Sequence, residues 1–423
     1  MHLNRRDLLT GLGGLAASAA LSPAQTQMSA QPTLAAVSSS ADKTFPRKND
    51  FAVPAGLTYI NGAYMHPLPS AAVEAVRQHA ERRSRPGGIA APGNAALVKA
   101  VKEQFAALIN AKPSEISFIP NTSTGENLVV NGLGIVGSGG NVVTDALHFD
   151  GAILHLQALQ RNHGLDLRIA MPRDGRIELR ELERLADKKT KLIEVSLVAM
   201  YNGFQHDLKA VCDLAHAHGA YVYADIVQAA GATPIDVRAS GVDFCACSSF
   251  KWLMGDFGAG FLYARAELLE RVIRRSQYGY HSASNIETHF LPYDPPAGTP
   301  FTWELGTDAS ATFEVGSYAY APMAALGVSL PYIRQLGVEN IEAHRQPLLE
   351  RLRKEMPRLG FEPVTPPGTK SALLTFTVKE RQPVFERLQK ANINVRLGAH
   401  FMRVSPSVYN DLSDIDRLLE ALS

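Results

Sequence analysis

The chain contains little cysteine and almost no net charge. Its 423 residues include three cysteines and carry a formal net charge of +1. Three cysteines cannot all pair, and Cys245 and Cys247 would point to the same face of one strand, so we expect them to pack in a core rather than form a disulfide. The near-neutral charge gives no electrostatic reason to expect nucleic acid or an anionic membrane surface as a partner.

The chain also lacks an N-terminal apolar run long enough for a membrane anchor. The run from Gly11 to Leu21 is well short of the ~20 apolar residues that a span requires. It follows Asn4-Arg5-Arg6-Asp7-Leu8-Leu9-Thr10 and leads into Ala/Ser-rich sequence. This order predicts a twin-arginine export signal with a disordered linker over residues 1–42, a periplasmic location, and the twin-arginine translocase as a partner.

Two ligand-binding patterns are incomplete. His216 and His218 alternate at a helix end without a third ligand, so no metal site is expected. The glycines of Gly132-Leu-Gly134-Ile-Val-Gly137 match a dinucleotide fingerprint, but this motif follows a helix and runs into a strand. A fingerprint needs the strand before it and the helix after it, so we reject a dinucleotide site.

What the chain does contain is an alternation of helical and strand-like segments. Hydrophobic residues make up 46% of it, enough for a large core and two domains. Short β-rich runs separated by helices between about Ser70 and Ala264 predict an α/β fold with a mostly parallel sheet. We expect an N-terminal segment over 43–69 that packs with the small domain, a large domain over 70–310, and a smaller α+β domain over 311–423. The expected strands of the large domain are Asn141–Thr144, Leu192–Val198, Tyr221–Ala224, Phe244–Ser248 and Phe261–Ala264.

Other local signals set helix limits and one long loop. Ser70 is expected to cap a helix that runs to Arg83, a second helix is expected over Val98–Leu108, and Ser413 is expected to cap the last helix. The proline-rich stretch from Tyr278 to Thr307 is expected to be rich in turns.

Lys251 carries the main chemical signal. It closes the run Val242-Asp-Phe-Cys-Ala-Cys-Ser-Ser-Phe-Lys251, and Asp225 ends the strand-like run before it. Burial lowers the pKa of a lysine and makes its amine nucleophilic. A lysine that forms a Schiff base and a carboxylate that keeps a ring nitrogen protonated are what an enzyme needs to hold pyridoxal 5'-phosphate (PLP).

A helix N-terminus supplies a candidate phosphate site. Ser123 and Glu126 fit a capping box, which would merely satisfy the first turn. The same N-terminus, with its unpaired N–H groups and positive dipole end, is also suited to a phosphate. Because Lys251 and Asp225 are present, phosphate binding is the favoured interpretation.

Two further residues fit the same site. His148 follows a strand at the expected carboxyl edge of the sheet, where ligands of α/β proteins bind. Two interpretations are equally supported: His148 stacks over a flat cofactor ring, or it is an ordinary loop histidine. Arg403 interrupts an apolar strand-like run, where an arginine is costly unless it is paired. Its planar guanidinium can pair with both oxygens of a substrate carboxylate, so substrate binding is preferred to a surface position.

With these residues in order, the chain resembles the class V aminotransferases, the fold-type I PLP family that includes cysteine desulfurases, kynureninase and isopenicillin N epimerase. The resemblance extends from Leu57 to Ser423 and is most specific over Val242–Leu262. Phe250 departs from it, because the position before the lysine is usually His, Gln or Arg. A phosphate contact normally made there must come from elsewhere or be absent.

The resemblance implies roles for the matching residues. Lys251 would form the Schiff base, Asp225 would pair with the pyridinium nitrogen, and His148 would stack on the ring. The other implied cofactor contacts are Thr122, Ser123, Gln228, Ser248 and Asn202, with Gly306 and Thr307 reaching the phosphate of a neighbouring subunit in a homodimer that shares its active sites. The implied substrate contacts are Arg403, Arg396, Asn61 and Tyr280.

The sequence excludes one reaction of this family and leaves several others open. Desulfurases place a nucleophilic cysteine in the loop near Arg396, and Leu397–Phe401 contains none. What remains is removal of an α-proton by Lys251, followed by transamination, epimerisation or loss of a β-substituent. We expect an aminotransferase acting on an amino-acid-like or peptide-borne amino group. The alternatives are an epimerase or a C–S or β-lyase, and, from a different class, a non-enzymatic periplasmic binding protein.

The export signal adds a similarity within the family. An exported member is similar to the periplasmic enzyme that modifies the glutamyl side chain of pyoverdine siderophores. That similarity implies the tailoring of an exported metabolite.

Overall fold

The structure, a computed structural model, describes residues 44–86, 93–269, 271–289 and 300–423. The predicted export signal and its linker lie outside these residues. Within the described ranges, no helix combines the length and the apolar character that a membrane crossing requires.

A seven-stranded sheet forms the centre of the larger part of the chain. Neighbouring strands are parallel except where β8 is involved, because β8 runs antiparallel to both β2 and β7. The prediction of a mostly parallel α/β sheet is therefore confirmed. Across the sheet the order is β2 (Ile116–Ile119), β8 (Gly260–Ala264), β7 (Phe244–Ser248), β6 (Tyr221–Asp225), β5 (Thr190–Ser196), β3 (Asn141–Asp145) and β4 (Asp166–Ala170).

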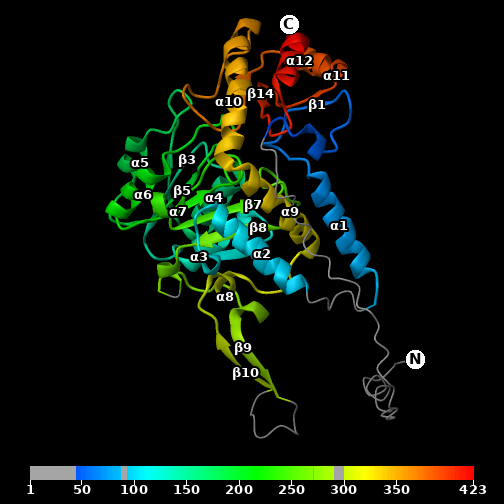
Figure 1. The fold of residues 1–423 in the computed structure, drawn as a ribbon. Coiled ribbons are helices and arrows are strands. Elements are labelled where there is room, and N and C mark those ends of the chain that lie inside the picture. Colours follow the sequence, from blue (N-terminus) through cyan, green and yellow to red (C-terminus); the bar gives the residue numbers. More distant parts are fainter. Residues whose placement is uncertain (1–43, 87–92, 270, 290–299) are drawn as a thin grey trace, which may run out of the picture. The chain divides into compact units, whose positions relative to one another are not determined.

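Helices cover both faces of this sheet (Figure 1). Parallel strands need crossover connections, and the helices that make them bury apolar side chains against the sheet. One face packs against α2 (Gly93–Leu108), α5 (Leu179–Leu185), α6 (Leu208–Ala217), α7 (Val237–Ser240) and α9 (Tyr320–Leu336). The other face packs against α3 (Thr122–Gly132), α4 (Asp150–His163) and α8 (Ala309–Phe313).

A smaller antiparallel sheet lies in the C-terminal part, in the order β11 (Leu374–Thr377), β14 (Phe401–Val404) and β13 (Arg396–Leu397). Leu352, Phe376 and Ile415 belong to the apolar core that joins this sheet to its helices. The helices are α10 (Val338–Glu355), α11 (Arg381–Lys390) and α12 (Leu412–Leu422).

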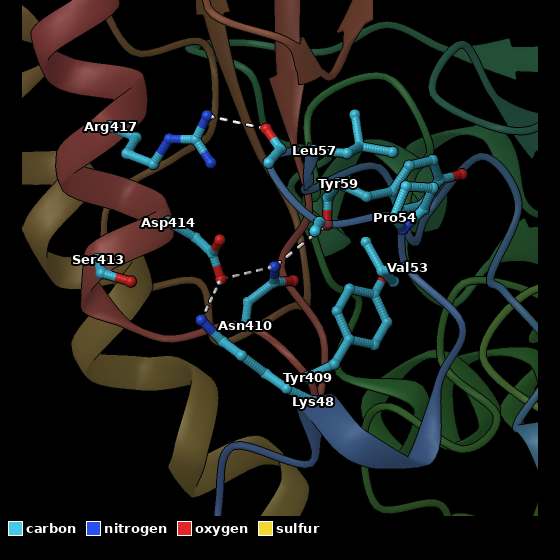
Figure 2. A pocket seen from close by; sticks show the side chains of 12 residues that line it. Lys48, Val53, Pro54, Leu57, Tyr59, Tyr409, Asn410, Ser413, Asp414 and Arg417 are labelled. Atoms are coloured by element: carbon cyan, nitrogen blue, oxygen red, sulfur yellow. Dashed lines mark hydrogen bonds and ion pairs between the residues drawn. The ribbon is translucent and has the colours of Figure 1, made fainter.

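The N-terminal segment is attached to this C-terminal part by backbone pairing. Strand β1 (Thr58–Tyr59) pairs in parallel with β12 (Ile393–Asn394), and α1 (Ser70–Arg83) follows it. Figure 2 shows the side-chain contacts at this junction, where Asn410 donates to the Tyr59 carbonyl at 3.1 Å and to Asp414 at 3.1 Å. Lys48 completes the junction with an ion pair to Asp414 at 3.6 Å. The segment before the sheet is thereby fixed close to Arg403, which lies on β14.

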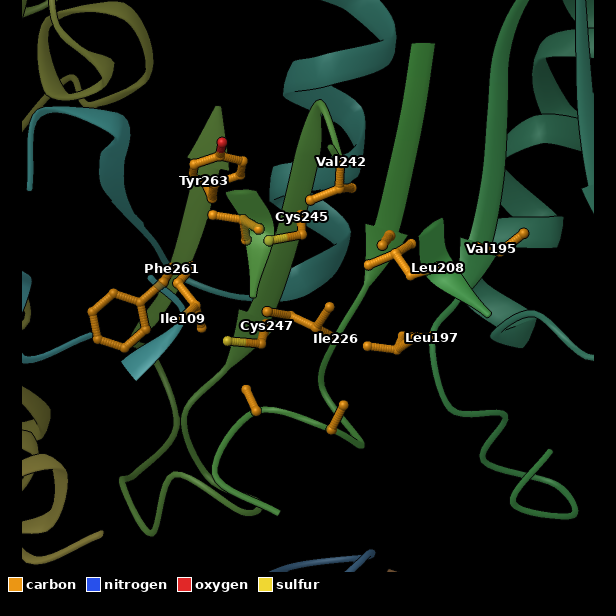
Figure 3. Close-up of a cluster of buried hydrophobic side chains, with 14 of the residues drawn as sticks. Ile109, Val195, Leu197, Leu208, Ile226, Val242, Cys245, Cys247, Phe261 and Tyr263 are labelled. Carbon is orange, nitrogen blue, oxygen red and sulfur yellow. The ribbon is translucent and has the colours of Figure 1, made fainter. Parts of the chain in front are cut away.

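The three cysteines are buried and free, as their small number and spacing predict. Figure 3 shows Cys245 and Cys247 on one face of β7, in the same apolar cluster as Ile226 and Phe261. Because side chains alternate along a strand, Phe244 and Ala246 lie in the cluster on the opposite face.

Three local expectations differ from the structure. Asp411, not Ser413, caps α12, because its carboxylate accepts from the Asp414 N–H. The stretch expected to be rich in turns contains the antiparallel strands β9 (Ala283–Thr288) and β10 (Phe301–Leu305). Strands β2 and β4 were not expected.

Candidate active site

Lys251 lies in the turn that follows β7, at the edge of the sheet. The turn is held by a hydrogen bond from Met254 N–H to the Lys251 carbonyl at 2.9 Å and by one from Ser249 Oγ to the Asp256 carbonyl at 2.6 Å. Burial lowers the pKa of the Lys251 amine to about 8, the Asp225 carboxylate acts in the opposite sense, and Arg403 lowers it further. A lysine in this state has a usable neutral amine near neutral pH.

Asp225 ends the neighbouring strand β6, so its carboxylate faces the same edge of the sheet. It is buried and accepts a hydrogen bond from Val227 N–H at 2.8 Å. Burial raises the pKa of this carboxyl, while the charges of His148 and Lys251 act to lower it. The predicted pairing of an acid and a lysine on successive strand ends is present.

His148 lies just beyond β3 and is fully buried. Its Nδ1 lies 2.8 Å from Ser196 Oγ, at the end of β5. Its Nε2 has no hydrogen-bond partner in the described part of the chain. The ring is therefore held on one side and free on the other, and its stacking on a cofactor stays a prediction.

The N-terminus of α3 lies against the end of β7, as a phosphate site requires. Thr122 N–H donates to Ser248 Oγ at 3.1 Å, and Ser248 N–H donates to Thr122 Oγ1 at 2.9 Å. Asn121 caps the helix by accepting from Thr124 N–H at 2.9 Å, so the capping box between Ser123 and Glu126 is wrong. Thr122 and Ser123 thus lie at a helix N-terminus of the kind that binds anions.

The side chains of Gln228 and Asn202 already make hydrogen bonds within the protein. Gln228 donates to the Ala63 carbonyl at 3.0 Å and accepts from Trp252 Nε1 at 3.0 Å. Asn202 donates to the Gly175 carbonyl at 2.7 Å and accepts from Phe204 N–H at 3.0 Å. A carboxamide has two donors and two lone pairs, so Gln228 keeps capacity for one further contact of each kind.

Arg403 on β14 is buried, with 5% of its surface exposed. One of its terminal nitrogens donates to the Met200 carbonyl at 2.8 Å, and its Nε has no partner among the described residues. Burial lowers the pKa of its guanidinium to about 10, and Arg396 acts in the same sense. An incompletely paired buried cation is suited to an anionic substrate group.

Of the other predicted substrate residues, one is buried and two are exposed. Arg396 pairs across the strands with Arg403, is exposed, and lies over the Tyr64 ring at 5.3 Å. Asn61 is buried, donates to Asn394 Oδ1 at 3.0 Å, and has an unpaired Oδ1 in the described structure. Tyr280 is 73% exposed in the 3-10 turn Tyr280–Ser282, whose Ser282 carbonyl accepts from Gly306 N–H at 3.0 Å. The role of Tyr280, Gly306 and Thr307 in a site shared between subunits stays a prediction.

Several residues of the site were not predicted. Trp252 follows Lys251, is buried, and positions Gln228. Glu126, His155 and Glu194 form a buried polar cluster next to His148. The signal for Glu194 was present, since a lone carboxylate inside an apolar strand is as costly as the arginine at 403.

These residues fit PLP. The site offers an amine of lowered pKa, a buried carboxylate on the adjacent strand, a histidine with an unpaired nitrogen, hydroxyls at a helix N-terminus, and an arginine with an unpaired Nε. Each is the donor or acceptor type that the aldehyde, ring nitrogen, phosphate and substrate carboxylate need.

Comparison with known proteins agrees with this assignment. The family model for aminotransferase class-V matches residues 88–418. The cysteine desulfurase of Klebsiella pneumoniae subsp. pneumoniae is 31% identical over 346 residues, covering 77% of this chain and 82% of that protein.

Solved structures show the same fold. The apo cysteine desulfurase of Thermococcus onnurineus NA1 superposes with a TM-score of 0.78 at 24% identity, covering 90% of this chain and 98% of that chain. The cystine C-S lyase C-DES, solved with its product cysteine persulfide, gives a TM-score of 0.76 at 23% identity, covering 87% and 97%. From its residues, its fold and the family match, this chain belongs to the PLP-dependent class-V aminotransferase family.

Proposed function

We propose that this protein is an aminotransferase-type enzyme that acts on the amino group of an amino-acid-like or peptide-borne substrate. The observation that carries the proposal is the buried Lys251 amine, whose pKa falls to about 8, beside the Asp225 carboxylate. PLP, when bound, supplies an electron sink for negative charge at the substrate Cα. Lys251 holds the cofactor and then moves a proton at that carbon.

The remaining residues position the reactants. Asp225 holds a positive charge on the ring nitrogen, and His148 covers the ring. The hydroxyls of Thr122, Ser123 and Ser248 would contact the phosphate at the N-terminus of α3. Arg403 binds the substrate carboxylate, which fixes the Cα–H bond relative to the Lys251 amine.

A second candidate is a lyase that eliminates a β-substituent by C–S cleavage. The curated relative is named a cysteine desulfurase and one structural neighbour is a cystine C-S lyase, which favours sulfur substrates. Direct sulfur abstraction needs an enzyme thiol, and the three cysteines are buried with raised thiol pKa values, about 12 for Cys212. Elimination needs no such thiol, so it is the sulfur chemistry that this chain can support.

One experiment separates these reactions. Purified holoenzyme is incubated with a panel of amino acids that includes cystine, and the cofactor absorbance, keto acids and released sulfur species are followed. Transamination predicts a shifted cofactor band with one keto acid formed per site in a half-reaction. Pyruvate with persulfide from cystine would assign the lyase, and loss of α-deuterium without keto acid would assign an epimerase. A colourless protein that binds ligands equally well without Lys251 would overturn all three.

We also propose a homodimer. The exposed side chains of Tyr278 and Tyr280, just before β9, and of Trp303 on β10 line one apolar surface together with Ile286, called here the β9–β10 surface. Exposed apolar patches of this kind mark association sites. A second copy of the chain is the proposed occupant, because it would bring Gly306 and Thr307 to the other subunit's phosphate site.

Export through the twin-arginine route to the periplasm, and tailoring of an exported metabolite such as a siderophore, complete the proposal. The support is the paired Arg5 and Arg6 followed by a short apolar run. Cell fractionation tests it, because changing both arginines to lysine is expected to retain the enzyme in the cytoplasm. Unchanged fractionation would contradict export by this route.

A further inference from the structure

A cluster of acid and imidazole groups lies buried between the sheet and helices α3 and α4. Glu194 extends from β5, Glu126 from α3, and His148 from the segment after β3. One oxygen or nitrogen atom from each of these three lies within 4.8 Å of the others. All three side chains are buried, and the roles assigned above use only His148.

The hydrogen bonds of this cluster are incomplete. Glu126 accepts from or donates to His155 Nδ1 at 2.6 Å, which satisfies one of its oxygens. Both oxygens of Glu194 and the Nε2 of His148 have no partner within the described ranges. An ionised carboxylate without hydrogen bonds is the most costly state that a buried acid can adopt.

The charges around Glu194 also favour its neutral form. The groups that face it are Glu126 from α3, Tyr223 and Asp225 from β6, His148, and, through Glu126, His155 from α4. Burial raises the pKa of Glu194 well above its usual value, and the carboxylates of Glu126 and Asp225 raise it further. His155 Nδ1 lies 2.6 Å from a Glu126 oxygen, so this imidazole is held by Glu126.

We propose that Glu194 is a neutral carboxylic acid that positions His148 by sharing its proton with Nε2, directly or through one water. A proton donated to Nε2 requires the N–H of the ring to lie on Nδ1, which then donates to Ser196 Oγ. The ring is thereby held at both nitrogens, in one tautomer. Asp225 remains the one carboxylate of the group that is free to serve the ring nitrogen of the cofactor. The role of Asp225 toward the cofactor rests on the proposed function, whereas the protonation of Glu194 does not.

Infrared difference spectroscopy of the purified protein, with and without added PLP, tests the protonation directly. Wild type minus Glu194→Gln is expected to show the C=O stretch of a protonated carboxylic acid, shifted in D2O, from pH 6 to 8. Glu126→Gln is the matched control, since Glu126 has a hydrogen-bond partner in His155, and it is expected to leave that C=O band in place. If Glu194→Gln instead loses the band of an ionised carboxylate, the proposal is overturned. It is also overturned if wild type contains about one equivalent of divalent metal per chain and Glu194→Gln contains none.

The positioning role is tested by PLP affinity and by the cofactor spectrum. Glu194→Gln keeps a neutral donor, so its PLP dissociation constant is expected to stay within about 3-fold of wild type. Glu194→Leu fills the same space without a donor, and we expect about 10-fold weaker PLP binding with a shifted absorbance band. If Glu194→Leu folds and binds PLP like wild type, the role in positioning is excluded. If wild type itself binds no PLP, the proposed function fails, while the infrared result still decides the state of Glu194.

Discussion

Asp225 and Lys251 extend from successive parallel strands of the sheet and act on each other's protonation. The Asp225 carboxylate raises the pKa of the Lys251 amine, and the charge of Lys251 lowers the pKa of Asp225. Burial opposes both effects and is the larger cause for each group. The balance leaves an amine with a pKa of about 8 next to a carboxyl whose pKa is raised by burial.

The first prediction concerns the pH dependence of PLP attachment to apoenzyme. With a pKa of about 8, roughly one Lys251 amine in ten is neutral at pH 7, against roughly one in three thousand for a lysine at 10.5. The attachment rate should rise about tenfold per pH unit below 8 and level off above it. Stopped-flow absorbance measures this rate. A rate that keeps rising past pH 10 would show an ordinary lysine.

Asp225→Asn removes the carboxylate that supports both Lys251 and the ring nitrogen. The pKa of Lys251 should fall below 8, because the Asp225 carboxylate raises it against the effects of burial and of Arg403. Turnover should fall by roughly 10²–10³-fold, the usual cost of removing one preorganised electrostatic group. The pH–rate profile and kcat measure both effects. Asp213→Asn on the surface, where Asp213 pairs with Lys209, is the control and should change neither.

Arg403→Leu tests the substrate-carboxylate site. Loss of charged hydrogen bonds costs about 1.5–3 kcal/mol, so kcat/KM should fall roughly 10- to 150-fold, mainly through KM. Steady-state kinetics with a carboxylate substrate and its amide analogue measure this, and the amide should lose little. Arg358→Leu removes a surface guanidinium that pairs with Glu355 and should leave KM unchanged. An equal loss for acid and amide would remove Arg403 from carboxylate binding.

Replacing Cys212, Cys245 and Cys247 together by alanine tests the absence of a catalytic thiol. The three side chains are buried and belong to one apolar core, so stability should fall, by roughly 0.5–3 kcal/mol per site. Turnover per folded molecule should stay within a few-fold of wild type. Loss of activity in a variant that still folds and binds PLP would mean that one of the cysteines takes part in the reaction.

Trp303→Asp tests the homodimer. A charge in the middle of an apolar contact is costly, so the variant should shift toward monomer in analytical ultracentrifugation and bind PLP less tightly. Leu154→Asp is the matched control, since Leu154 is an exposed leucine on α4, outside the β9–β10 surface. A wild type that is already monomeric would contradict the proposal.

The catalytic core was predictable because its signals are local. Alternation of period two along β6 and β7, with helical spacing between the strands, places Asp225 and Lys251 at one edge of a parallel sheet. The cysteine pair at 245 and 247 followed from the same alternation. The C-terminal end of helix α1 at Arg83 was predicted, but Pro69 occupies its N-cap position and the predicted cap, Ser70, is the first helical residue.

What could not be predicted depends on contacts between distant segments. Asn121 and Ser123 are both good caps, and only the backbone at 121 decides that Asn121 caps α3. A carboxylate in an apolar strand marks Glu194 as unusual, but its neighbours Glu126 and His148 come from α3 and from the segment after β3, far away in the chain. Strands β9 and β10 pair with each other across a proline-rich stretch, so neither is recognisable alone.

The most direct test of the central claim is reductive trapping of the bound cofactor. Purified holoenzyme is treated with borohydride and digested, and the peptides are mapped by mass spectrometry. The account predicts one phosphopyridoxyl group per chain, on the peptide that contains Lys251, and none in Lys251→Ala. A label on another lysine, or unreduced wild type with no cofactor absorbance after incubation with PLP, would contradict it.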